Sequence, residues 1–473
     1  MSPTMNLEGF RAALGDIPVE DNPRIVQQKS RDHYWYSPRL KQQLEGVTAQ
    51  LVVSPRSTEE VVQVLRAAFA NDVPVTPRGA GTGNYGQAMP LSGGVMLSLT
   101  NLDKVLNIEP DRVRAEAGVI LEKLDEQTAH AVNGEMRFHP STYRMATLGG
   151  FIAGGSGGVG SIRWGGLRNF GNLLGLKVVT CEAEPRVLDL SGPDILKVAH
   201  AYGTNGIIVE AEIPLAAHYD WVDMMVGFDS IMEACAFAEQ VALQDGLLCK
   251  EISPVAAPVA YDYFNRHRPY IRSREQSVVL LMVAPAAVPA MLDFVKFHRG
   301  DLLLNAATLE PEAKAKLPPI YELAWNHTTL RGLKIDPTIT YLQTQYPDLE
   351  HVQWAIDTFG DEMPMHIEMT RFDGRVVFSG LPIVRYTSEE RLEEIIRLHE
   401  ENGCLVFNPH RYTLEEGGMK KTDRAQLAFK HEADPKGILN PGKMIAWDDP
   451  DFDFESGRTW LFTGLYTLGH AAE

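Results

Sequence analysis

Hydrophobic and polar positions follow helical and strand-like periods through the first half of the chain. A capping-box start at residues 57–60 precedes apolar residues at helical spacing up to Phe69, which predicts a helix with one face against a sheet. The apolar segment 73–78 runs straight into glycines, as a strand does when it enters a ligand loop. Further strands are predicted at 95–99, 105–109 and 113–117, and a polar helix from Leu121.

The pattern changes after Leu215, where glycine becomes rarer and helical stretches alternate with strand-like runs. We place a domain boundary near residue 216 on this change. Two apolar runs between Met365 and Tyr386 flank Asp373-Gly374, which is a strong hairpin signal. The other elements predicted here are a helix at 229–244, a strand at 277–283, a helix at 388–402, a strand at 404–407 and a turn-rich return to the first domain at 434–447.

The composition is typical of a folded protein, and the length predicts two domains or one domain with a large insertion. The chain has 473 residues, 44% of them hydrophobic and 22% charged. A formal net charge of -18 without a basic block argues against nucleic acid as a partner. The most apolar stretch, 278–291, is interrupted by prolines and too short to cross a bilayer, so we interpret it as a buried strand and turn. Scattered cysteines and a start without an apolar signal segment predict reduced thiols and a cytoplasmic location.

Two glycine clusters are the strongest chemical signal. The first, Arg78-Gly-Ala-Gly-Thr-Gly-Asn84, follows a predicted strand, and its backbone N–H groups can form a nest for phosphate oxygens. The second places ten of the 40 glycines within residues 149–171, among apolar side chains that a solvated linker would not carry. Two such clusters suit a ligand with a pyrophosphate and two planar ends, although the spacing is not that of a Rossmann fingerprint.

Four motifs, in this order, resemble one family of flavoproteins. They read PRGAGTGNYGQ, PSTYRMATLGGFIAGGSGGVGS, YGTNGIIVEAEIPL and DPKGILNPGKM. They are similar to the FAD-binding oxidoreductases of the vanillyl-alcohol oxidase and p-cresol methylhydroxylase type, and most similar to the subgroup of glycolate oxidase and D-lactate dehydrogenase flavoproteins. The resemblance implies an α+β fold with a two-part FAD-binding domain and an inserted α+β cap, or substrate, domain. The expected bounds are 1–216 (core at about 45–216), 217–425 for the cap, and 426–473 for the C-terminal return.

The resemblance also implies which residues hold FAD. The first cluster would cradle the pyrophosphate, the second would hold the isoalloxazine and ribityl parts, a third segment would lie by the adenine, and the C-terminal return would close the site. These residues are Arg78, Gly79, Ala80, Gly81, Thr82, Gly83 and Asn84; Pro140, Ser141, Thr142, Gly149, Gly150, Gly154, Ser156 and Ser161; Gly206, Ile207 and Ile208; and Asn440, Gly442 and Lys443.

This chain lacks the residues through which some family members bind FAD covalently. Members with tethered flavin carry a histidine near the first cluster, and doubly tethered members add a cysteine in the second region. This chain has Asn84 and Tyr85, and no cysteine between Gly79 and Thr180. Non-covalent FAD is therefore expected, with a link through a cap histidine as the alternative.

Candidate catalytic residues lie in the expected cap. Oxidation of an alcohol by flavin needs a base or solvent for the second proton, and histidine titrates in the right range. His410 ranks first because it stands where the chain turns back toward the flavin domain, and a structural role is the alternative for it and for His327. The predicted catalytic set is His410, His327, Arg411 and Tyr412. Arg331, Arg371 and Arg411 are candidates to bind a substrate carboxylate. For any single arginine, a surface salt bridge is the simpler interpretation.

No metal is predicted, and whether the cap holds a divalent metal stays open. Relatives with such a metal have PxxHxGDGNxH and a later GEHG, where this chain reads PMHIEMTRFDGRVVFSG and NPHRYTLEEGG. His366, Glu368 and His410 could form a rearranged site. We prefer the interpretation that His366 and Glu368 pair on a solvated strand, because alternate side chains share one face of a strand.

The predicted function is an FAD-dependent oxidoreductase that oxidises a small alcohol-bearing substrate, with a 2-hydroxy acid as the first expectation. One alternative is an aromatic or phenolic alcohol, suggested by Trp325, Trp354, Tyr341 and Tyr346. Another is a non-catalytic flavin subunit of a larger complex. The expected partners are a small-molecule substrate, an unidentified electron acceptor and, as an option, a second copy in a homodimer, with neither nucleic acid nor an integral membrane segment.

Overall fold

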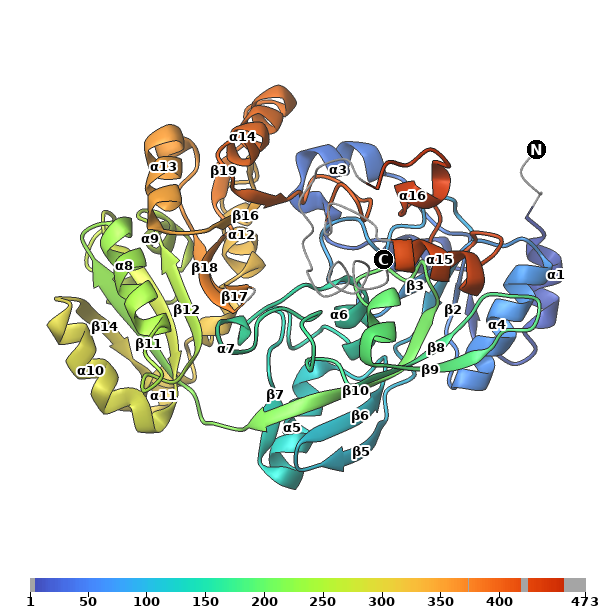
Figure 1. The fold of residues 1–473 in the computed structure, drawn as a ribbon, viewed down its shortest axis with the longest axis horizontal. Helices are drawn as coiled ribbons and strands as arrows, with labels where there is room; N and C mark the ends of the chain where they lie inside the picture. Colours follow the sequence, from blue (N-terminus) through green and yellow to red (C-terminus); the bar gives the residue numbers. More distant parts are fainter. Residues whose placement is uncertain (1–4, 373, 418–423, 455–473) are drawn as a thin grey trace, which may run out of the picture.

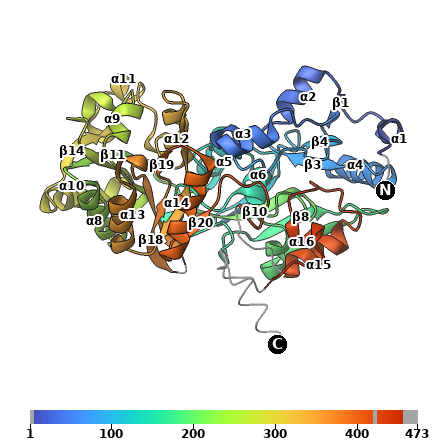
Figure 2. The same ribbon diagram turned by 90° about the horizontal axis from the view of Figure 1, so that it is seen from above.

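The structure is a computed structural model that describes residues 5–372, 374–417 and 424–454. Two groups of sheets lie side by side (Figure 1, and from above in Figure 2). One group uses the chain up to β10 (Ile207–Ala217), and the other runs from β11 (Val222–Phe228) to β20 (Leu405–Phe407). The change between groups falls beside the boundary expected near 216. The division into domains at 1–216, 217–425 and 426–473 stays a prediction.

The first sheet has the order β1-β2-β4-β3, and β4 pairs in parallel with both β2 and β3. Helix α4 (Thr58–Ala70) covers it with Val61, Val64 and Leu65, as the helical spacing predicted. The strands are β1 (Val19–Glu20), β2 (Leu51–Val53), β3 (Val75–Arg78) and β4 (Val95–Ser98), and the other helices here are α1 (Leu7–Ala13), α2 (Pro23–Lys29) and α3 (Pro38–Leu44).

The second sheet has the order β5-β6-β10-β8-β9, with β7 also paired to β10. Helix α6 (Leu148–Gly154) lies close to this sheet because Gly149 has no side chain, and a Cβ there would stand 2.6 Å from the Cβ of Ala117. Part of the second glycine cluster is thus helical. The strands are β5 (Val105–Glu109), β6 (Arg112–Glu116), β7 (Gly134–Met136), β8 (Gly175–Val179) and β9 (Val187–Ser191), with helices α5 (Leu121–Val132) and α7 (Ser161–Trp164).

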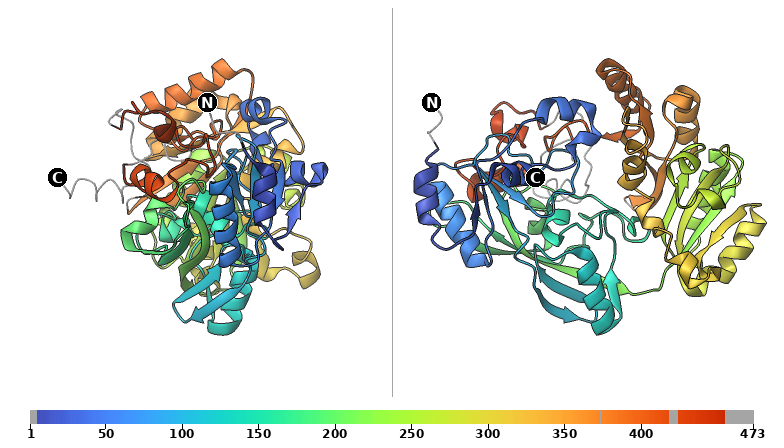
Figure 3. Two further views of the ribbon diagram at one scale, coloured as in Figure 1. Left: turned by 90° about the vertical axis from the view of Figure 1, so that its right-hand side faces the viewer. Right: turned by 180° about the vertical axis from the view of Figure 1, so that it is seen from behind.

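Three further sheets make up the second group, with orders β12-β13-β11-β14, β17-β18-β16-β20 and β15-β19. Helix α8 packs against β12 and β13 of the first of these sheets, and the view from behind again shows this second group beside the first (Figure 3). The strands are β12 (Cys249–Val255), β13 (Ser277–Val283), β14 (Asp301–Asn305), β15 (Ile339–Tyr341), β16 (Gln343–Tyr346), β17 (Ile367–Phe372), β18 (Arg375–Gly380) and β19 (Ile383–Arg385). The helices are α8 (Ile231–Ala242), α9 (Val259–Tyr263), α10 (Val288–Phe297), α11 (Pro311–Lys314), α12 (Asn326–Leu333), α13 (Leu349–Phe359) and α14 (Glu389–Glu401).

The apolar stretch 278–291 differs from its prediction as a strand and turn. Strand β13 ends at Val283, but Val288 already begins helix α10. Pro289 occupies the first turn of that helix, where the N–H that proline lacks has no helical partner in any case. Among the residues that the structure describes, no helix is both long and apolar enough to cross a membrane.

The hairpin and the C-terminal return were predicted from turn residues. Strands β17 and β18 pair antiparallel and turn at Gly374, which has φ +77°, while its predicted partner Asp373 lies outside the described residues. After α15 (Arg424–Ala433) the chain returns to β3, where the Val75 N–H donates to the Ile438 carbonyl (2.9 Å) and the Asn440 N–H donates to the Val75 carbonyl (2.8 Å). The chain then forms α16 (Ile445–Asp448).

Candidate active site

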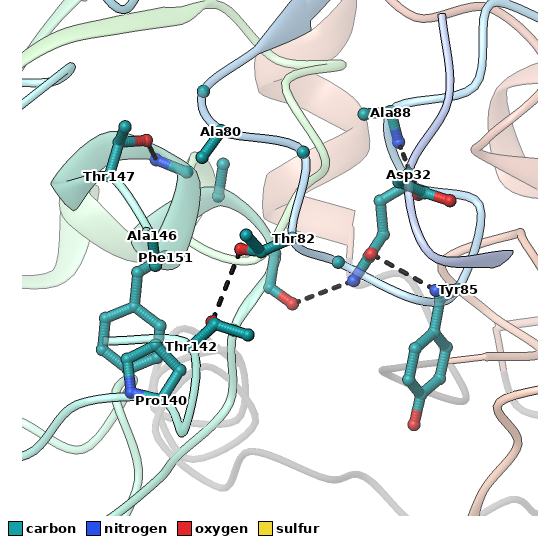
Figure 4. A pocket seen from close by; sticks show the side chains of 18 of the residues that line it. Asp32, Ala80, Thr82, Tyr85, Ala88, Pro140, Thr142, Ala146, Thr147 and Phe151 are labelled. Carbon is teal, nitrogen blue, oxygen red and sulfur yellow. Dashed lines mark hydrogen bonds between the residues drawn. The ribbon is translucent and has the colours of Figure 1, made fainter. Parts of the chain in front are cut away.

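The largest feature of the site is a cavity between the two glycine clusters, which we call the glycine-loop cavity (Figure 4). Most residues predicted to hold the cofactor line it, including the whole first cluster and the segment beside β10. The lining includes Arg78, Gly79, Ala80, Gly81, Thr82, Gly83, Asn84, Pro140, Ser141, Thr142, Gly149, Gly150, Gly154, Ser156, Gly206, Ile207 and Ile208.

The first glycine cluster wraps around its own arginine. The Arg78 guanidinium donates to the carbonyls of Arg31 (2.6 Å) and Ala80 (3.1 Å). Gly81 has φ +70°, and a Cβ there would lie 2.0 Å from Arg78 Nη1. The loop therefore keeps this shape only with glycine at position 81.

The second cluster approaches the first so closely that side chains are excluded from the space between them. A Cβ on Gly79 would lie 2.0 Å from Thr147 Oγ1, which also caps α6 by accepting from the Gly150 N–H (3.3 Å). The Thr142 hydroxyl donates to the Thr82 hydroxyl at 3.5 Å and joins the two clusters (Figure 4). The result is a narrow cavity lined largely by backbone, which suits a ligand with a pyrophosphate.

The C-terminal return supports this cavity from behind. The Asn440 amide donates to the carbonyls of Gln87 (2.8 Å) and Tyr202 (2.7 Å), and Lys443 Nζ donates to the Gly86 carbonyl (2.6 Å). Asn440, Gly442 and Lys443 lie outside the cavity lining. These three residues hold the loop that follows the first cluster, rather than facing the cavity.

Asp32 is a buried charge of the site that the sequence analysis missed. Its carboxylate accepts from the backbone N–H groups of Tyr34 (2.9 Å) and Ala88 (3.3 Å), and it lines the cavity (Figure 4). Burial raises its pKa and lowers the pKa of Lys443, while attraction between the two opposes both shifts. The aromatic run at 34–36 was the sequence signal that could have marked this segment as buried.

A second cavity adjoins the first, and the two share lining residues. The shared residues are Ser156, Gly157, Trp325, Gln343 and Phe407. We call this space the second cavity; Arg371, Arg168, Asn169 and the predicted cofactor residue Ser161 are also in its wall. Most of its wall comes from the β17–β18 hairpin and from the segment around α7.

His327 is the predicted catalytic histidine that the structure places at the glycine-loop cavity. It lines this cavity from helix α12, and His33, which the sequence analysis did not consider, lines it as well. Burial, together with the nearby charges of Arg331 and Lys334, lowers the pKa of His327 to about 4. The imidazole is therefore neutral at physiological pH and able to accept a proton.

The structure does not bring His410 to the site, although it ranked first. It is fully buried, its Nδ1 lies 2.7 Å from the Ser37 hydroxyl, and its Nε2 lies 3.0 Å from the Tyr341 carbonyl. Because a carbonyl only accepts, Nε2 carries the proton and Nδ1 accepts from Ser37. Both ring nitrogens make hydrogen bonds outside the two cavities. We therefore do not propose His410 as the base.

The other cap candidates also lie away from the two cavities. Arg411 pairs with Glu393 (2.7 Å), Tyr412 lies under the Lys443 ammonium (4.9 Å to the ring centroid), and Arg331 Nε donates to the Glu322 carbonyl (2.9 Å). None of these three is among the cavity-lining residues. Of the aromatic residues that suggested a phenolic substrate, Tyr341, Tyr346 and Trp354 pack in the core and Trp325 lines both cavities.

The preferred interpretation of His366 and Glu368 needs a correction. The two side chains do pair, at 2.8 Å, but both are fully buried, so the strand face is not solvated. Strand β17 is covered by β12, which the sequence pattern did not reveal. Across the described ranges, no group of three or more His, Cys, Asp or Glu residues is arranged to hold a metal ion.

Comparison with known proteins agrees with this geometry. The FAD binding domain family matches residues 49–189. The chain is 30% identical over 433 residues to glycolate oxidase subunit GlcD of Bacillus subtilis (strain 168), a match that spans 84% of this chain and 89% of that protein.

Solved structures share the fold at low identity. Alkyldihydroxyacetonephosphate synthase has a TM-score of 0.71 at 16% identity, over 93% of this chain and 85% of that chain. p-Cresol methylhydroxylase with substrate bound has a TM-score of 0.64 at 16% identity, over 95% and 97% of the two chains. The glycine-lined cavity fits FAD, because glycines of both clusters line it and leave backbone groups close to a ligand. The chain therefore belongs to the FAD-binding oxidoreductases of the vanillyl-alcohol oxidase and p-cresol methylhydroxylase type, as its four motifs predicted.

Proposed function

We propose that this oxidoreductase acts on a 2-hydroxy acid, whose carboxylate is held in the second cavity while its hydroxyl-bearing carbon faces the glycine-loop cavity. FAD, when bound, supplies the hydride acceptor. The observation that carries the proposal is the presence of an arginine, Arg371, in a cavity that adjoins the one lined by His327. The similarity to a glycolate oxidase subunit supports it, because glycolate is the smallest 2-hydroxy acid.

Arg371 is fixed at the wall in a way that leaves it able to bind an anion. Its Nε donates to the Ile162 carbonyl at 2.9 Å, which sets the plane of the guanidinium. Within the described part of the chain, its two terminal nitrogens make no hydrogen bond or ion pair. A guanidinium so placed can hold a carboxylate through charge-assisted hydrogen bonds.

His327 is the group that we propose as the base. In its neutral form it can take the hydroxyl proton of the substrate as the carbon loses its hydride. Arg371 and His327 then hold the two ends of a 2-hydroxy acid, the carboxylate and the hydroxyl, from the cap side.

A substrate panel tests this proposal. Under anaerobic conditions, short 2-hydroxy acids should bleach the flavin absorbance, whereas alcohols of equal length without a carboxylate, and benzylic alcohols, should not. Replacing Arg371 with methionine should raise KM for the acids by about 10- to 100-fold and lower kcat much less, since a hydrogen bond to a charged group is lost. Reoxidation with oxygen and with an artificial acceptor identifies the route by which the electrons leave.

Arg411→Met is the matched control for the arginine variant. Arg411 pairs with Glu393 outside both cavities, so the KM of this variant should stay within about threefold of the parent value. Bleaching by benzylic alcohols alone, or equal KM changes in the two arginine variants, would contradict the proposal.

The attachment of FAD can be checked by acid precipitation. Neither cavity has a cysteine in its lining, and Asn84 and Tyr85 stand where tethered relatives carry histidine. The flavin should therefore appear in the supernatant after precipitation, with about one FAD per chain. Colour that stays with the pellet would indicate a covalent bond, and His33 and His327 would be the first residues to examine by peptide mapping.

A further inference from the structure

Trp325 lies in the wall that the glycine-loop cavity and the second cavity share. It precedes helix α12 and has φ +54° and ψ -143°, a backbone conformation that residues with a side chain rarely adopt. Its ring reaches the second glycine cluster, since a Cβ on Gly157 would lie 3.8 Å from its Cη2. Such a strained residue persists only where its surroundings fix it, and this occurs most often at functional sites.

Two buried carboxyl groups hold both N–H groups of Trp325. Its backbone N–H donates to Glu368 Oε1 at 2.5 Å, and its indole N–H donates to Glu251 Oε2 at 3.1 Å. Glu368 is on β17 and is fully buried, while Glu251 is on β12 and is 2% exposed. Two strands far apart in sequence thus determine the position of one side chain.

One of the two carboxyl groups, Glu368, is itself held by a buried set of polar contacts. Glu368 Oε1 lies 2.8 Å from His366 Nε2, which lies 3.2 Å from the Ser253 hydroxyl and 3.3 Å from the Thr328 hydroxyl. Burial raises the pKa of Glu251 well above its ordinary value, and the charge and hydrogen bond of Glu368 raise it further. Two adjacent buried carboxyl groups do not both ionise readily, so the pair favours a state in which one of them keeps its proton.

We infer that Glu251 and Glu368 are positioning residues that hold Trp325 as a partial partition, which narrows the opening between the two cavities, and that this partition limits the size of 2-hydroxy acid that can reach FAD. The substrate class in this statement rests on the proposed function. The indole lies in the wall that the two cavities share, and its N–H is anchored by Glu251, so the ring cannot swing away without losing that hydrogen bond. The hydrogen bond from the backbone N–H to Glu368 fixes the main chain from which the ring projects.

A similar arrangement elsewhere in the chain provides a control. The indole N–H of Trp221 lies 3.0 and 3.1 Å from the two carboxylate oxygens of Glu135, which is buried and pairs with Lys250 at 2.8 Å. Neither Trp221 nor Glu135 lines either cavity. Substitution of Trp221 should therefore affect stability but not substrate size.

The first measurement is the ratio of kcat/KM for 2-hydroxyoctanoate to that for glycolate. Trp325→Ala should raise this ratio by about tenfold or more, because a cavity wall is removed, and discrimination by pocket size is of this order per methylene. Glu251→Leu should raise the ratio as well. Glu251→Gln keeps an oxygen acceptor for the indole N–H, so its ratio should stay within about threefold of the parent ratio. Trp221→Ala should leave the ratio unchanged.

The second measurement does not need turnover, so it separates this inference from the proposed function. Simple carboxylates from acetate to octanoate are titrated against the oxidised holoenzyme, and binding is followed by the change in FAD absorbance. Octanoate should bind more tightly relative to acetate in Trp325→Ala than in the parent. If no 2-hydroxy acid is oxidised but Trp325→Ala still shifts the preference toward octanoate, the inference about the partition is supported. The proposed substrate class is then overturned.

The remaining variants keep the test decisive. If Glu251→Leu loses FAD, Trp325→Phe serves instead, because it removes the indole N–H together with part of the ring. This variant should give a shift between those of the parent and Trp325→Ala. An unchanged size preference in Trp325→Ala would overturn the partition. If the size preference shifts in Trp325→Ala but not in Glu251→Leu or Trp325→Phe, the positioning role of the carboxyl groups is overturned.

Discussion

Replacing Gly81 with valine should abolish FAD binding and leave a folded apoprotein. The residue has φ +70°, which costs a β-branched residue about 1–2 kcal/mol or more. The added Cβ would also lie 2.0–2.2 Å from the guanidinium atoms of Arg78, which are held by the carbonyls of Arg31 and Ala80. The loop must therefore open, and its N–H groups no longer face the cavity. The ratio of flavin to protein absorbance after reconstitution with excess FAD measures the loss.

Gly46→Val is the matched control for this variant. Gly46 has φ +85°, but a Cβ there meets nothing within 4 Å, and the residue lies outside the cavity lining. This variant suffers the same kind of backbone strain without the clash, so it should keep its FAD. Full flavin content in Gly81→Val would mean that the first glycine cluster is an ordinary turn.

His327→Ala should keep FAD but reduce it with substrate about 10²- to 10⁴-fold more slowly, the usual cost of losing a general base. The measurement is anaerobic stopped-flow of flavin reduction, once a substrate has been found in the panel. Because burial holds the pKa of His327 near 4, activity in the parent should fall only as the pH drops toward that value, where the imidazole gains its proton. A fall centred near the ordinary histidine pKa would point to another group.

His410→Ala separates a structural from a catalytic effect. It removes hydrogen bonds to Ser37 and Tyr341, so it should lower thermal stability and leave flavin reduction close to the parent rate. Reduction by His327→Ala within about threefold of the parent would remove this histidine as the base. His33, another imidazole of the cavity lining whose charge acts on His327, would then be the next residue to test.

Local signals in the sequence were enough for several elements and for most of the residues that line the glycine-loop cavity. Helix α4 follows from Ser57 and its apolar spacing, and the loop at Gly81 follows from a glycine pattern that only a close backbone approach explains. These features depend on residues within one or two turns of each other. The four motifs added the family and FAD, because together and in this order they are specific to that family.

Only the tertiary structure decided which cap residues reach the site. His410 ranked above His327 from its place in the sequence, yet strand pairing and packing place His410 against Ser37 and Tyr341 and His327 at the cavity. Whether His366 and Glu368 are solvated depends on β12 lying over β17, a contact between strands more than a hundred residues apart along the chain. The burial of a polar side chain is set by such long-range contacts and not by its neighbours in sequence, because the cost of removing it from water is offset by hydrogen bonds from other elements. For the same reason, Asp32, His33 and the two carboxyl groups that hold Trp325 emerged only from the fold.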